Sequence, residues 1–355
     1  MTLRAPLATD TGPSRWPTVA GAVVLLTAIT SVLLTAFAWP SARSSVHDVP
    51  IAVAGPATAV AQVRSALDQR LPGGFEITEV SDTAAAEQLI RDRRVYGAID
   101  VSSGSPQVVI ASAASTAVAQ TLQATANGLG QAGKSGPPVA VRDLAALPAD
   151  DPRGAGLAAG ALPLVMGGLL AAVLLTGRVR GTARRVTGAL AFAATGGAAV
   201  TAILQFWLGS LSGPYAANTG AVALTIAATS LTVLGLESLL GYLGIGIGAV
   251  TMMLIGNPLS GTATAPEMLP GWSGGLGQLL PPGAGGQLLR STAFFDGHGA
   301  THPVTVLVAW FLFGVVLCLL GGLRARRTAT ITAGLPRSTR TTGGYDVNDP
   351  QRLTS

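Results

Sequence analysis

Six long apolar stretches constrain the fold of this chain more than any other feature of its sequence. A helix needs about 20 apolar residues to cross the ~30 Å hydrocarbon core of a bilayer. Only 11% of the 355 residues are charged, whereas soluble domains carry roughly 25%. The sequence therefore predicts a membrane all-α bundle of six transmembrane helices, at residues 18–38, 157–176, 186–208, 219–237, 242–256 and 304–323.

The first stretch has two interpretations. Ala36-Phe37-Ala38 fits the A-x-A pattern at which signal peptides are cleaved, which would make this stretch a signal peptide. The apolar part of a signal peptide is roughly 7–15 residues long, and this run is longer. An uncleaved transmembrane helix is therefore favoured, with cleavage after Ala38 as the alternative.

The fourth and fifth stretches come from one apolar run at residues 219–255. A run of this length is too long for one span, even a tilted one. It predicts two helices in a hairpin that turns near residues 237–242.

The placement of the arginines predicts the orientation. Arg4 and Arg15 precede the first stretch, GRVRGTARR lies between the second and third, and a basic cluster at 324–327 follows the sixth. Short loops rich in Lys and Arg stay in the cytoplasm. We therefore expect a multi-pass protein of the plasma (cytoplasmic) membrane with two cytoplasmic tails, at 1–17 and at 324–355, the second of them disordered. The net charge of +5 then reflects membrane lipid as the partner of these arginines rather than nucleic acid.

Residues 41–153 are not membrane-like, because strand and helix patterns alternate along them. The predicted orientation makes them a small extracytoplasmic α/β domain, inserted between transmembrane helices 1 and 2. Strands are expected at 49–54, 75–80, 96–101, 107–112 and 139–144, and helices at 58–71, 84–93 and 115–129.

The segment GLGQAGKS at 128–135 matches the phosphate-binding pattern G-x-x-x-x-G-K-[ST], and Lys134 is the only lysine of the chain. A working phosphate loop follows a strand and opens a helix. Here the glycines follow a predicted helix, and Gly136-Pro137-Pro138 cannot open a helix of ordinary length. The match is interpreted as a flexible linker, and replacing Lys134 with alanine is expected to leave function unchanged.

Other chemically suggestive residues form no pattern for catalysis, a metal or a cofactor. His298 and His302 are four residues apart, but glycines beside them disfavour the helix that would stack them on one metal ion. Asp150-Asp151 are interpreted as a solvated linker and the single cysteine, Cys318, as a small core residue. We expect no enzyme activity and no cofactor.

Glu237 is the one acidic residue of the apolar run at 219–255. A carboxylate within the membrane is a candidate functional site by default. Glu237 also lies close to the predicted cytoplasmic turn, where its side chain could simply reach water. Both interpretations, an intramembrane polar site and an interfacial residue, stay open.

Residues 257–302 form an outer loop in which Pro and Gly separate short apolar runs, such as Leu279-Leu280 and Leu288-Leu289. Such runs are too short to cross a bilayer and too apolar to lie in water. They predict re-entrant or interfacial half-helices packed on the outer face of the membrane.

This order of parts resembles the ABC-2 type transporter permeases, and within them the branch that includes the phage-infection-protein-like membrane proteins. Three stretches carry the resemblance: IAVAGP with the helix after it at 51–71, PADDPRG before the second transmembrane helix, and GNPLSG…MLP…LLPPGAGGQLLRSTAFFDG at 256–297. With the architecture, the resemblance covers nearly the whole chain apart from its two tails.

The resemblance implies an exporter permease subunit that forms a homodimer or heterodimer and pairs with a separate cytoplasmic ATP-binding subunit. It implies an ATPase-coupling loop with Arg178, Arg180, Arg184 and Arg185, and an outer re-entrant motif that begins with Asn257, Pro258, Ser260 and Gly261. The arginines also fit positive-inside anchoring. The spans offer no charged path apart from Glu237, which favours a hydrophobic or amphipathic substrate. The alternative is a non-transporting envelope protein whose outer domain binds a partner, a cell-wall component or a phage.

Overall fold

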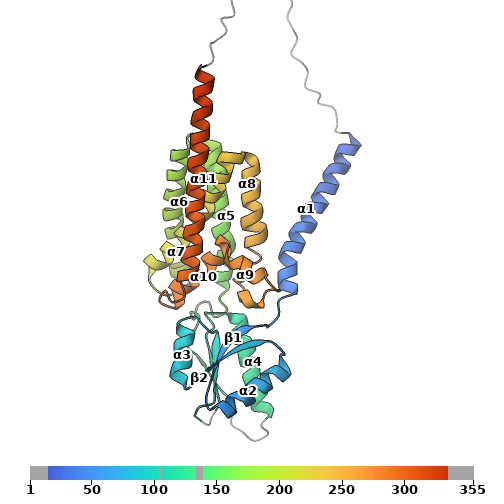
Figure 1. Ribbon diagram of the computed structural model, residues 1–355, viewed down its shortest axis with the longest axis vertical. Coiled ribbons are helices and arrows are strands. Elements are labelled where there is room, and N and C mark those ends of the chain that lie inside the picture. The colour runs from blue at the N-terminus through green and yellow to red at the C-terminus, as the bar shows by residue number, and fades with distance from the viewer. Residues whose placement is uncertain (1–14, 104–105, 133–138, 335–355) are drawn as a thin grey trace, which may run out of the picture.

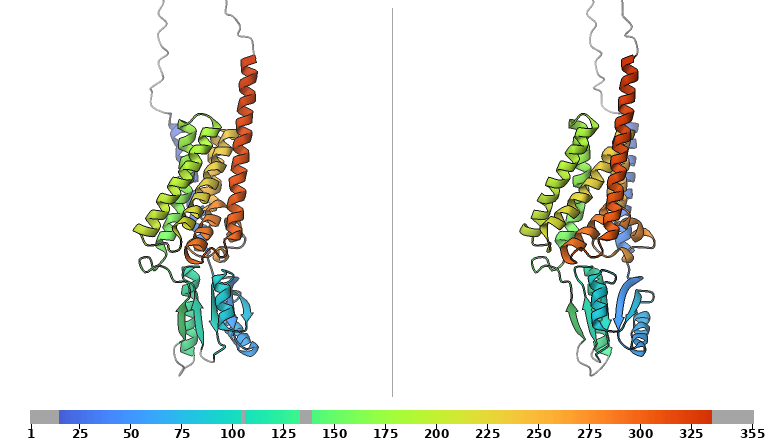
Figure 2. Two further views of the ribbon diagram at one scale, coloured as in Figure 1. Left: turned by 90° about the vertical axis from the view of Figure 1, so that its left-hand side faces the viewer. Right: turned by 60° about the vertical axis from the view of Figure 1, so that its left-hand side comes forward.

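The computed structural model describes residues 15–103, 106–132 and 139–334. The fold is predominantly helical: a bundle of long helices stands on a small α/β lobe, and α1 (Trp16–Ala42) leans away from the bundle (Figure 1). Two further views place the lobe at one end of the bundle and show α11 (Thr301–Gly334) extending past the other helices at the far end (Figure 2).

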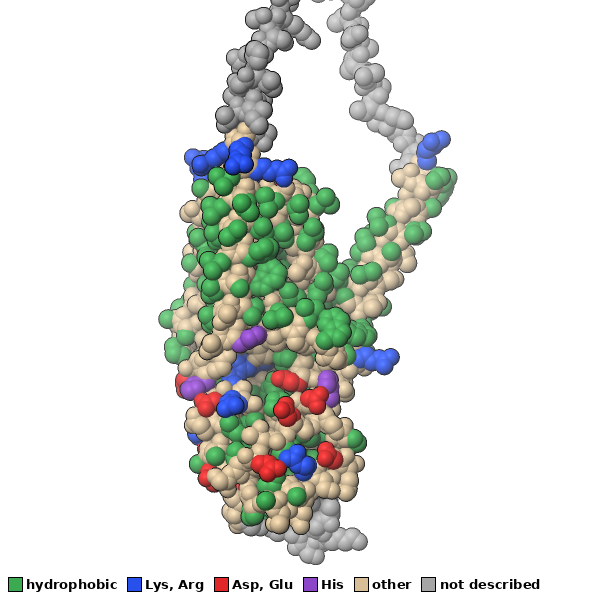
Figure 3. All heavy atoms as spheres, in the orientation of Figure 1, with side chains coloured by type: hydrophobic (Ala, Val, Ile, Leu, Met, Phe, Trp, Pro, Cys, Tyr) green, Lys and Arg blue, Asp and Glu red, His purple; other side chains and the backbone are tan. Residues whose placement is uncertain are grey.

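Within the described residues, five helices are long and apolar enough to cross a membrane. Hydrophobic side chains cover the sides of the bundle, whereas charged ones gather on the lobe and at the end of the bundle far from it (Figure 3). These features indicate a multi-pass membrane protein built on a helical bundle. The five helices are α1, α5 (Ala155–Arg178), α6 (Thr182–Ala202) with its π-helical continuation η1 (Ile203–Trp207), α7 (Tyr215–Leu240) and the part of α11 up to Arg327.

The fifth predicted span, at 242–256, is shorter than the others. The chain turns at Gly241, which has a positive φ of 64°, and α8 (Tyr242–Ala249) then continues into the π-helical segment η2 (Val250–Gly256). The predicted hairpin turn is thus confirmed. The helix after it rises only about 20 Å, less than the ~30 Å of a bilayer core, so the layout of six transmembrane helices stays a prediction.

α7 is the central helix, because α5, α6, α10 (Pro281–Phe294) and α11 all pack against it. Its contact with α11 is very close: a Cβ on Gly314 would lie 2.5 Å from the backbone nitrogen of Thr232. Small residues let helices approach in lipid, where packing and interhelical hydrogen bonds drive association. Thr232 Oγ1 and Ser238 Oγ accordingly donate to the carbonyl oxygens of Trp310 and Leu317 on α11, each at 3.2 Å.

Gly314→Ala should push α7 and α11 apart and lower the thermal unfolding midpoint of the detergent-solubilised protein, at a cost of about 1–3 kcal/mol for an overpacked contact. Gly220→Ala on α7 is the matched control, because a Cβ there meets nothing within 4 Å. Equal midpoints for the two variants would contradict the close α7–α11 contact.

The lobe contains a five-stranded mixed sheet in the order β2-β1-β3-β4-β5, in which only β3 and β4 pair antiparallel. All eight predicted elements are confirmed, with boundaries that differ from the predicted ones by at most three residues. The strands are β1 (Val49–Ala54), β2 (Phe75–Val80), β3 (Gly97–Asp100), β4 (Gln107–Ile110) and β5 (Ala140–Asp143), and the helices are α2 (Ala57–Arg70), α3 (Thr83–Arg91) and α4 (Thr116–Ala132).

Alternation along the strands explains the layers of the lobe. Ile51 and Val53 point to the face that α2 and α4 cover, while Ala52 points to the face that α3 covers. The outer loop enters both cores, because Met268 joins the first and Phe295 the second. The lobe is therefore packed together with this loop rather than tethered to it.

The outer loop contains short helices, as the sequence predicts. They are η3 (Pro266–Met268), α9 (Ser273–Gln278) and α10. α10 packs against α7 and α11, and η3 packs into the lobe. This loop therefore connects the centre of the bundle to the lobe.

Two predictions about element ends are wrong. Asp151 is not solvated: it is 8% exposed, and its carboxylate accepts hydrogen bonds from the backbone N–H groups of Ala155 and Gly156, both at 2.8 Å. These bonds satisfy two free backbone N–H groups at the start of α5, where the helix dipole also favours a negative charge.

The tail predicted as disordered begins as helix, because α11 continues to Gly334 through Arg and Ala, which are good helix formers. Residues 1–14 and 335–355 lie outside the described residues.

Candidate functional site

The arginines between α5 and α6 divide into two groups. Arg178, Arg180 and Arg184 are exposed, and none of them forms an ion pair with another residue in the described ranges. Arg185 turns inward instead, and its side chain is 24% exposed. The segment predicted as a coupling loop thus has an outward basic face and one inward anchor.

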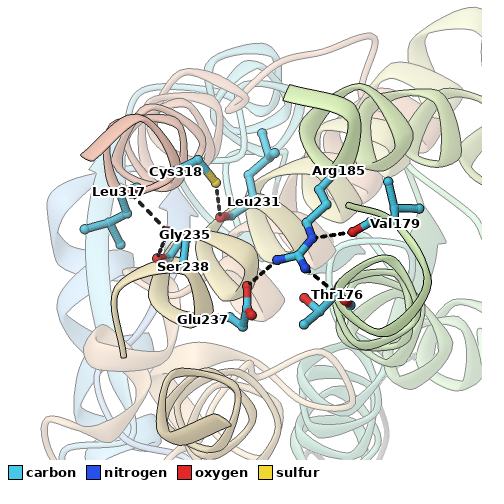
Figure 4. Close-up of polar contacts among 9 residues, drawn as sticks. All are labelled: Thr176, Val179, Arg185, Leu231, Gly235, Glu237, Ser238, Leu317 and Cys318. Atoms are coloured by element: carbon cyan, nitrogen blue, oxygen red, sulfur yellow. Dashed lines mark hydrogen bonds and ion pairs between the residues drawn. The ribbon is translucent and has the colours of Figure 1, made fainter. Parts of the chain in front are cut away.

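Arg185 connects three helices (Figure 4). Its Nη1 lies 3.0 Å from Glu237 Oε2 on α7. Its Nε and Nη2 donate to the carbonyl oxygens of Val179 and Thr176 at the end of α5, at 2.8 and 3.0 Å. The Glu237 side chain is 14% exposed, so the carboxylate is mostly withdrawn from solvent. The structure thereby brings Arg185 of the predicted coupling loop into contact with Glu237, which the sequence offered as a separate candidate site.

Helix dipoles explain why this pair forms. Glu237 lies in the last turn of α7, where the dipole disfavours a negative charge, and Arg185 lies in the first turn of α6, where it disfavours a positive one. Pairing offsets both effects, and the last carbonyl groups of α5 gain a cationic donor. We call this group, Arg185 with Glu237, Thr176 and Val179, the Arg185 junction.

The predicted outer motif lines a cavity at the end of the bundle near the lobe. The cavity has a volume of about 280 Å³, and Asn257, Pro258, Ser260 and Gly261 all border it. Gly261 has a φ of 64°, and a Cβ there would lie 2.8 Å from the nitrogen of Pro266, so the turn requires glycine. The other lining residues are Phe37, Ser41 and Ser44 of the α1 end, Ala158, Ala161 and Leu162 of α5, and Thr262, Ala263, Thr264 and Leu269 of the loop. We call it the outer cavity.

Hydrogen bonds within the motif fix its backbone. Ser260 Oγ donates to Asn257 O and accepts from Thr262 Oγ1, each at 2.8 Å, and Ser260 O accepts from Gln278 Nε2 of α9 at 2.8 Å. The carboxamide of Asn257 is different, because it borders the cavity and the structure records no hydrogen bond for it among the described residues. A donor and an acceptor are therefore available to a ligand at this point.

Arg93 fastens the lobe to α10. It follows α3 with a positive φ of 57°, and its Nη1 donates to Gln287 O at 3.0 Å and to Ser291 Oγ, while its Nη2 donates to Gln287 Oε1. The guanidinium also lies over the ring of Phe295, 5.2 Å from its centroid. Burial in this contact lowers the pKa of Arg93. We call these four residues the Arg93 clamp.

A second polar group lies beside the clamp. Tyr96 OH donates to Glu267 Oε2 at 2.8 Å, and burial, with the charge of Glu267, raises the pKa of Tyr96. Arg290 is 5% exposed, donates from Nη2 to Thr262 O at 3.0 Å, and has its pKa lowered by burial to about 10, so it remains charged at neutral pH. Lobe, outer loop and α10 thus share one partly buried polar interface.

Sequence analysis missed Arg93, Tyr96 and Glu267. Arg93 and Arg94 are adjacent basic residues at a helix end, a pattern typical of a solvated surface, so the sequence carries no signal for burial there. Arg290 offered a better signal, because an isolated arginine between apolar runs must find hydrogen-bond partners when buried.

The remaining candidates have structural roles. His298 Nδ1 lies 3.0 Å from Asp92 Oδ1 of the lobe, and the described residues contain no group of His, Cys, Asp and Glu that could hold a metal ion. Cys318 is 2% exposed, which confirms it as a small core residue. The first five residues of GLGQAGKS lie at the end of α4, so a helix and not a strand leads into the match, while Lys134 and Ser135 fall outside the described residues.

No protein-family model, curated protein or solved structure matches this chain.

Proposed function

We propose that this chain is the permease subunit of an ABC-2 type exporter of the plasma membrane and works with a separate ATP-binding subunit. In this proposal α8 with η2 completes six transmembrane helices, both termini are cytoplasmic, and the lobe is extracytoplasmic. The loop between α5 and α6 then faces the ATPase. The chain acts as a homodimer or heterodimer, and its substrate is hydrophobic or amphipathic.

The Arg185 junction supports this proposal most directly. Arg178, Arg180 and Arg184 are exposed and available to an acidic partner surface, while Arg185 beside them is hydrogen-bonded to α5 and ion-paired to α7. A partner that displaces the loop must therefore move the end of α7, around which the bundle packs. Alternating access requires such a mechanical link. Glu237 is an anchor in this mechanism rather than a substrate site.

In this proposal, the end of α7 near the lobe faces the side of the membrane on which the substrate leaves. α10 packs on α7 and is held to the lobe by the Arg93 clamp, and Pro282 and Gly286 of α10 approach the same small internal void as Thr262 of the outer cavity wall. ATP-driven closure of the partner would push the loop, rock α5 and α7, and reshape the outer cavity. An amphipathic substrate would then leave on the lobe side.

Recovery of an ATPase subunit tests the proposal. We would affinity-purify the full-length chain in detergent from cells that naturally make it and identify co-purifying proteins by mass spectrometry. We expect a stoichiometric subunit with a nucleotide-binding domain. Arg180→Glu combined with Arg184→Glu should lower its recovery at least about tenfold, because reversed charges repel an acidic partner surface.

The matched control is Arg94→Glu with Arg153→Glu, two exposed arginines near the lobe. Equal ATPase recovery with both double variants would show that the loop between α5 and α6 does not contact the ATPase subunit. Recovery of no ATPase subunit with the unmodified chain would overturn the exporter proposal and favour the non-transporting envelope protein.

A further inference from the structure

The outer cavity combines neutral polar groups with apolar walls. Six of its lining residues carry hydroxyl or amide groups: Ser41, Ser44, Asn257, Ser260, Thr262 and Thr264. Phe37, Leu162 and Leu269 are among its apolar residues, and no Arg, Lys, Asp or Glu lines it in the part of the chain that the structure describes. Its volume of about 280 Å³ is close to the lower limit of small-molecule sites. Such a lining fits an uncharged ligand that can form hydrogen bonds.

The basic residues that follow the end of α1 face another way. Arg43 and His47 line a separate, shallower hollow together with Trp39. Trp39 and Arg43 are each two residues from Phe37 and Ser41, which is about 200° around an α-helix. Arg43 therefore lies on the opposite side of α1 from the outer cavity, and its charge does not neutralise a ligand there.

Two polar groups of the cavity lack hydrogen-bond partners among the described residues. They are the carboxamide of Asn257, which is half-exposed, and the buried Oγ of Ser44. A buried polar group such as the Ser44 hydroxyl, which loses water without gaining a partner, raises the free energy of the protein. A hydroxyl or amide on a ligand would satisfy both groups. A charged head group would instead meet no charged side chain in the lining, because Arg290 lies behind Thr262 and donates to its carbonyl oxygen, and entry would be far less favourable.

α1 offers a surface for hydrocarbon next to the cavity. Val23, Thr30 and Leu34 line a groove on α1, and their spacing continues that of Phe37 and Ser41, so all five share one helix face. The most apolar 18-residue window of α1 is 0% buried. This face of α1 therefore stays open to lipid along its length, from the outer cavity toward the far end.

We propose that the outer cavity binds the uncharged polyol head group, such as a sugar, of a diacyl amphiphile whose acyl chains lie along the open face of α1. Asn257 and Ser44 hydrogen-bond to the head group, and Phe37 and Leu34 contact the chains. The proposal rests on the exporter function, since it names the class of cargo. Binding itself needs no ATPase, so the two proposals can fail separately.

Two photoreactive lipids with identical chains test the proposal, one glucosyl-diacylglycerol and one phosphatidylglycerol, each with a diazirine in place of a chain methylene close to the glycerol. Both head groups are polyols, and they differ in the phosphate charge. The full chain would be placed in phosphatidylcholine nanodiscs, and labelled peptides would be quantified by mass spectrometry. We expect labelling at residues 34–44 and 257–269, with half-saturation at least about tenfold lower for the glucosyl lipid.

Variants locate the binding. Ala158→Trp should abolish labelling, because Ala158 is exposed and borders the cavity, whereas Ala159→Trp is the matched control on a neighbouring exposed position that does not border it. Asn257→Leu keeps the volume of the side chain but removes its hydrogen bonds. It should weaken labelling about fivefold, the value of one net hydrogen bond.

Three results would overturn the proposal. One is equal labelling by the two lipids. Another is labelling that Ala158→Trp and Ala159→Trp affect equally. The third is preferred labelling by phosphatidylglycerol that Arg43→Ala removes, which would place the head group in the basic hollow. Specific labelling by the glucosyl lipid, with no ATPase subunit recovered from cells, would sustain the lipid site and reject the exporter function alone.

Discussion

Reversing the charge of Arg185 should destabilise the protein more than reversing any other arginine of its loop. Arg185→Glu places a second carboxylate beside Glu237 and leaves the carbonyl groups of Thr176 and Val179 without their donor. Breaking a partly buried ion pair while adding a like charge should lower the free energy of unfolding by about 2–4 kcal/mol. The thermal unfolding midpoint in detergent would report this loss.

Arg184→Glu is the matched control, because Arg184 is the adjacent residue and is exposed. The double variant Arg185→Glu with Glu237→Arg restores opposite charges across α6 and α7 and should regain about half of the lost stability. The hydrogen bonds to α5 would still be missing, which limits the recovery. Strictly additive losses in this double-mutant cycle would show that the two residues do not interact.

The regular elements could be predicted because each depends on local patterns. The central strands of the lobe are short, mostly apolar runs of four to six residues bounded by turn residues, and its helices follow from periodicity over nine to seventeen residues. The hairpin at Gly241 follows from the length of one apolar run. These signals lie within short windows, so no knowledge of tertiary packing is needed to use them.

The partners of the polar residues could not be predicted in this way. Arg185 and Glu237 were both candidates, but they are 52 residues apart, and nothing local indicates which turns of α6 and α7 lie side by side. Asp151 has the residue type of a helix cap, yet its placement between prolines and beside Asp150 resembles a solvated linker. In each case the neighbouring helix end, which only the fold supplies, decides the role of the charge.

The outer cavity shows the same division between local and non-local information. The motif at Asn257 and Ser260 was implied by the resemblance to the ABC-2 type permeases, and the structure places it at a cavity. Its opposite walls come from α1 and α5, and the tilt that separates α1 from the bundle (Figure 1) has no signal in a uniformly apolar sequence. The lining could therefore be predicted only in part.

Removing the Arg93 side chain should loosen the lobe from the bundle. Arg93→Ala deletes three hydrogen bonds to Gln287 and Ser291 and the contact with the ring of Phe295. Part of this loss is recovered by water, which leaves a net cost of about 2 kcal/mol. A cost of this size shifts the equilibrium between the docked and the undocked lobe roughly thirtyfold. Hydrogen exchange should report it as faster exchange of peptides at 262–268 and 287–297, whose groups lie at the interface.

Arg94→Ala is the matched control, because Arg94 is exposed while its neighbour is clamped. Arg93→Lys should give an intermediate result, since lysine keeps the charge but lacks the planar fork that reaches both groups of Gln287. If Arg93→Ala and Arg94→Ala exchange at the same rate, the lobe must be held by its other contacts. Among these are the Met268 and Phe295 core contacts, the Tyr96–Glu267 hydrogen bond, the Asp92–His298 pair and the 2.7 Å bond from Ser115 Oγ to Thr264 O. Because those contacts reach the loop rather than the middle of α10, movement of α7 would then pass to the lobe through the wall of the outer cavity.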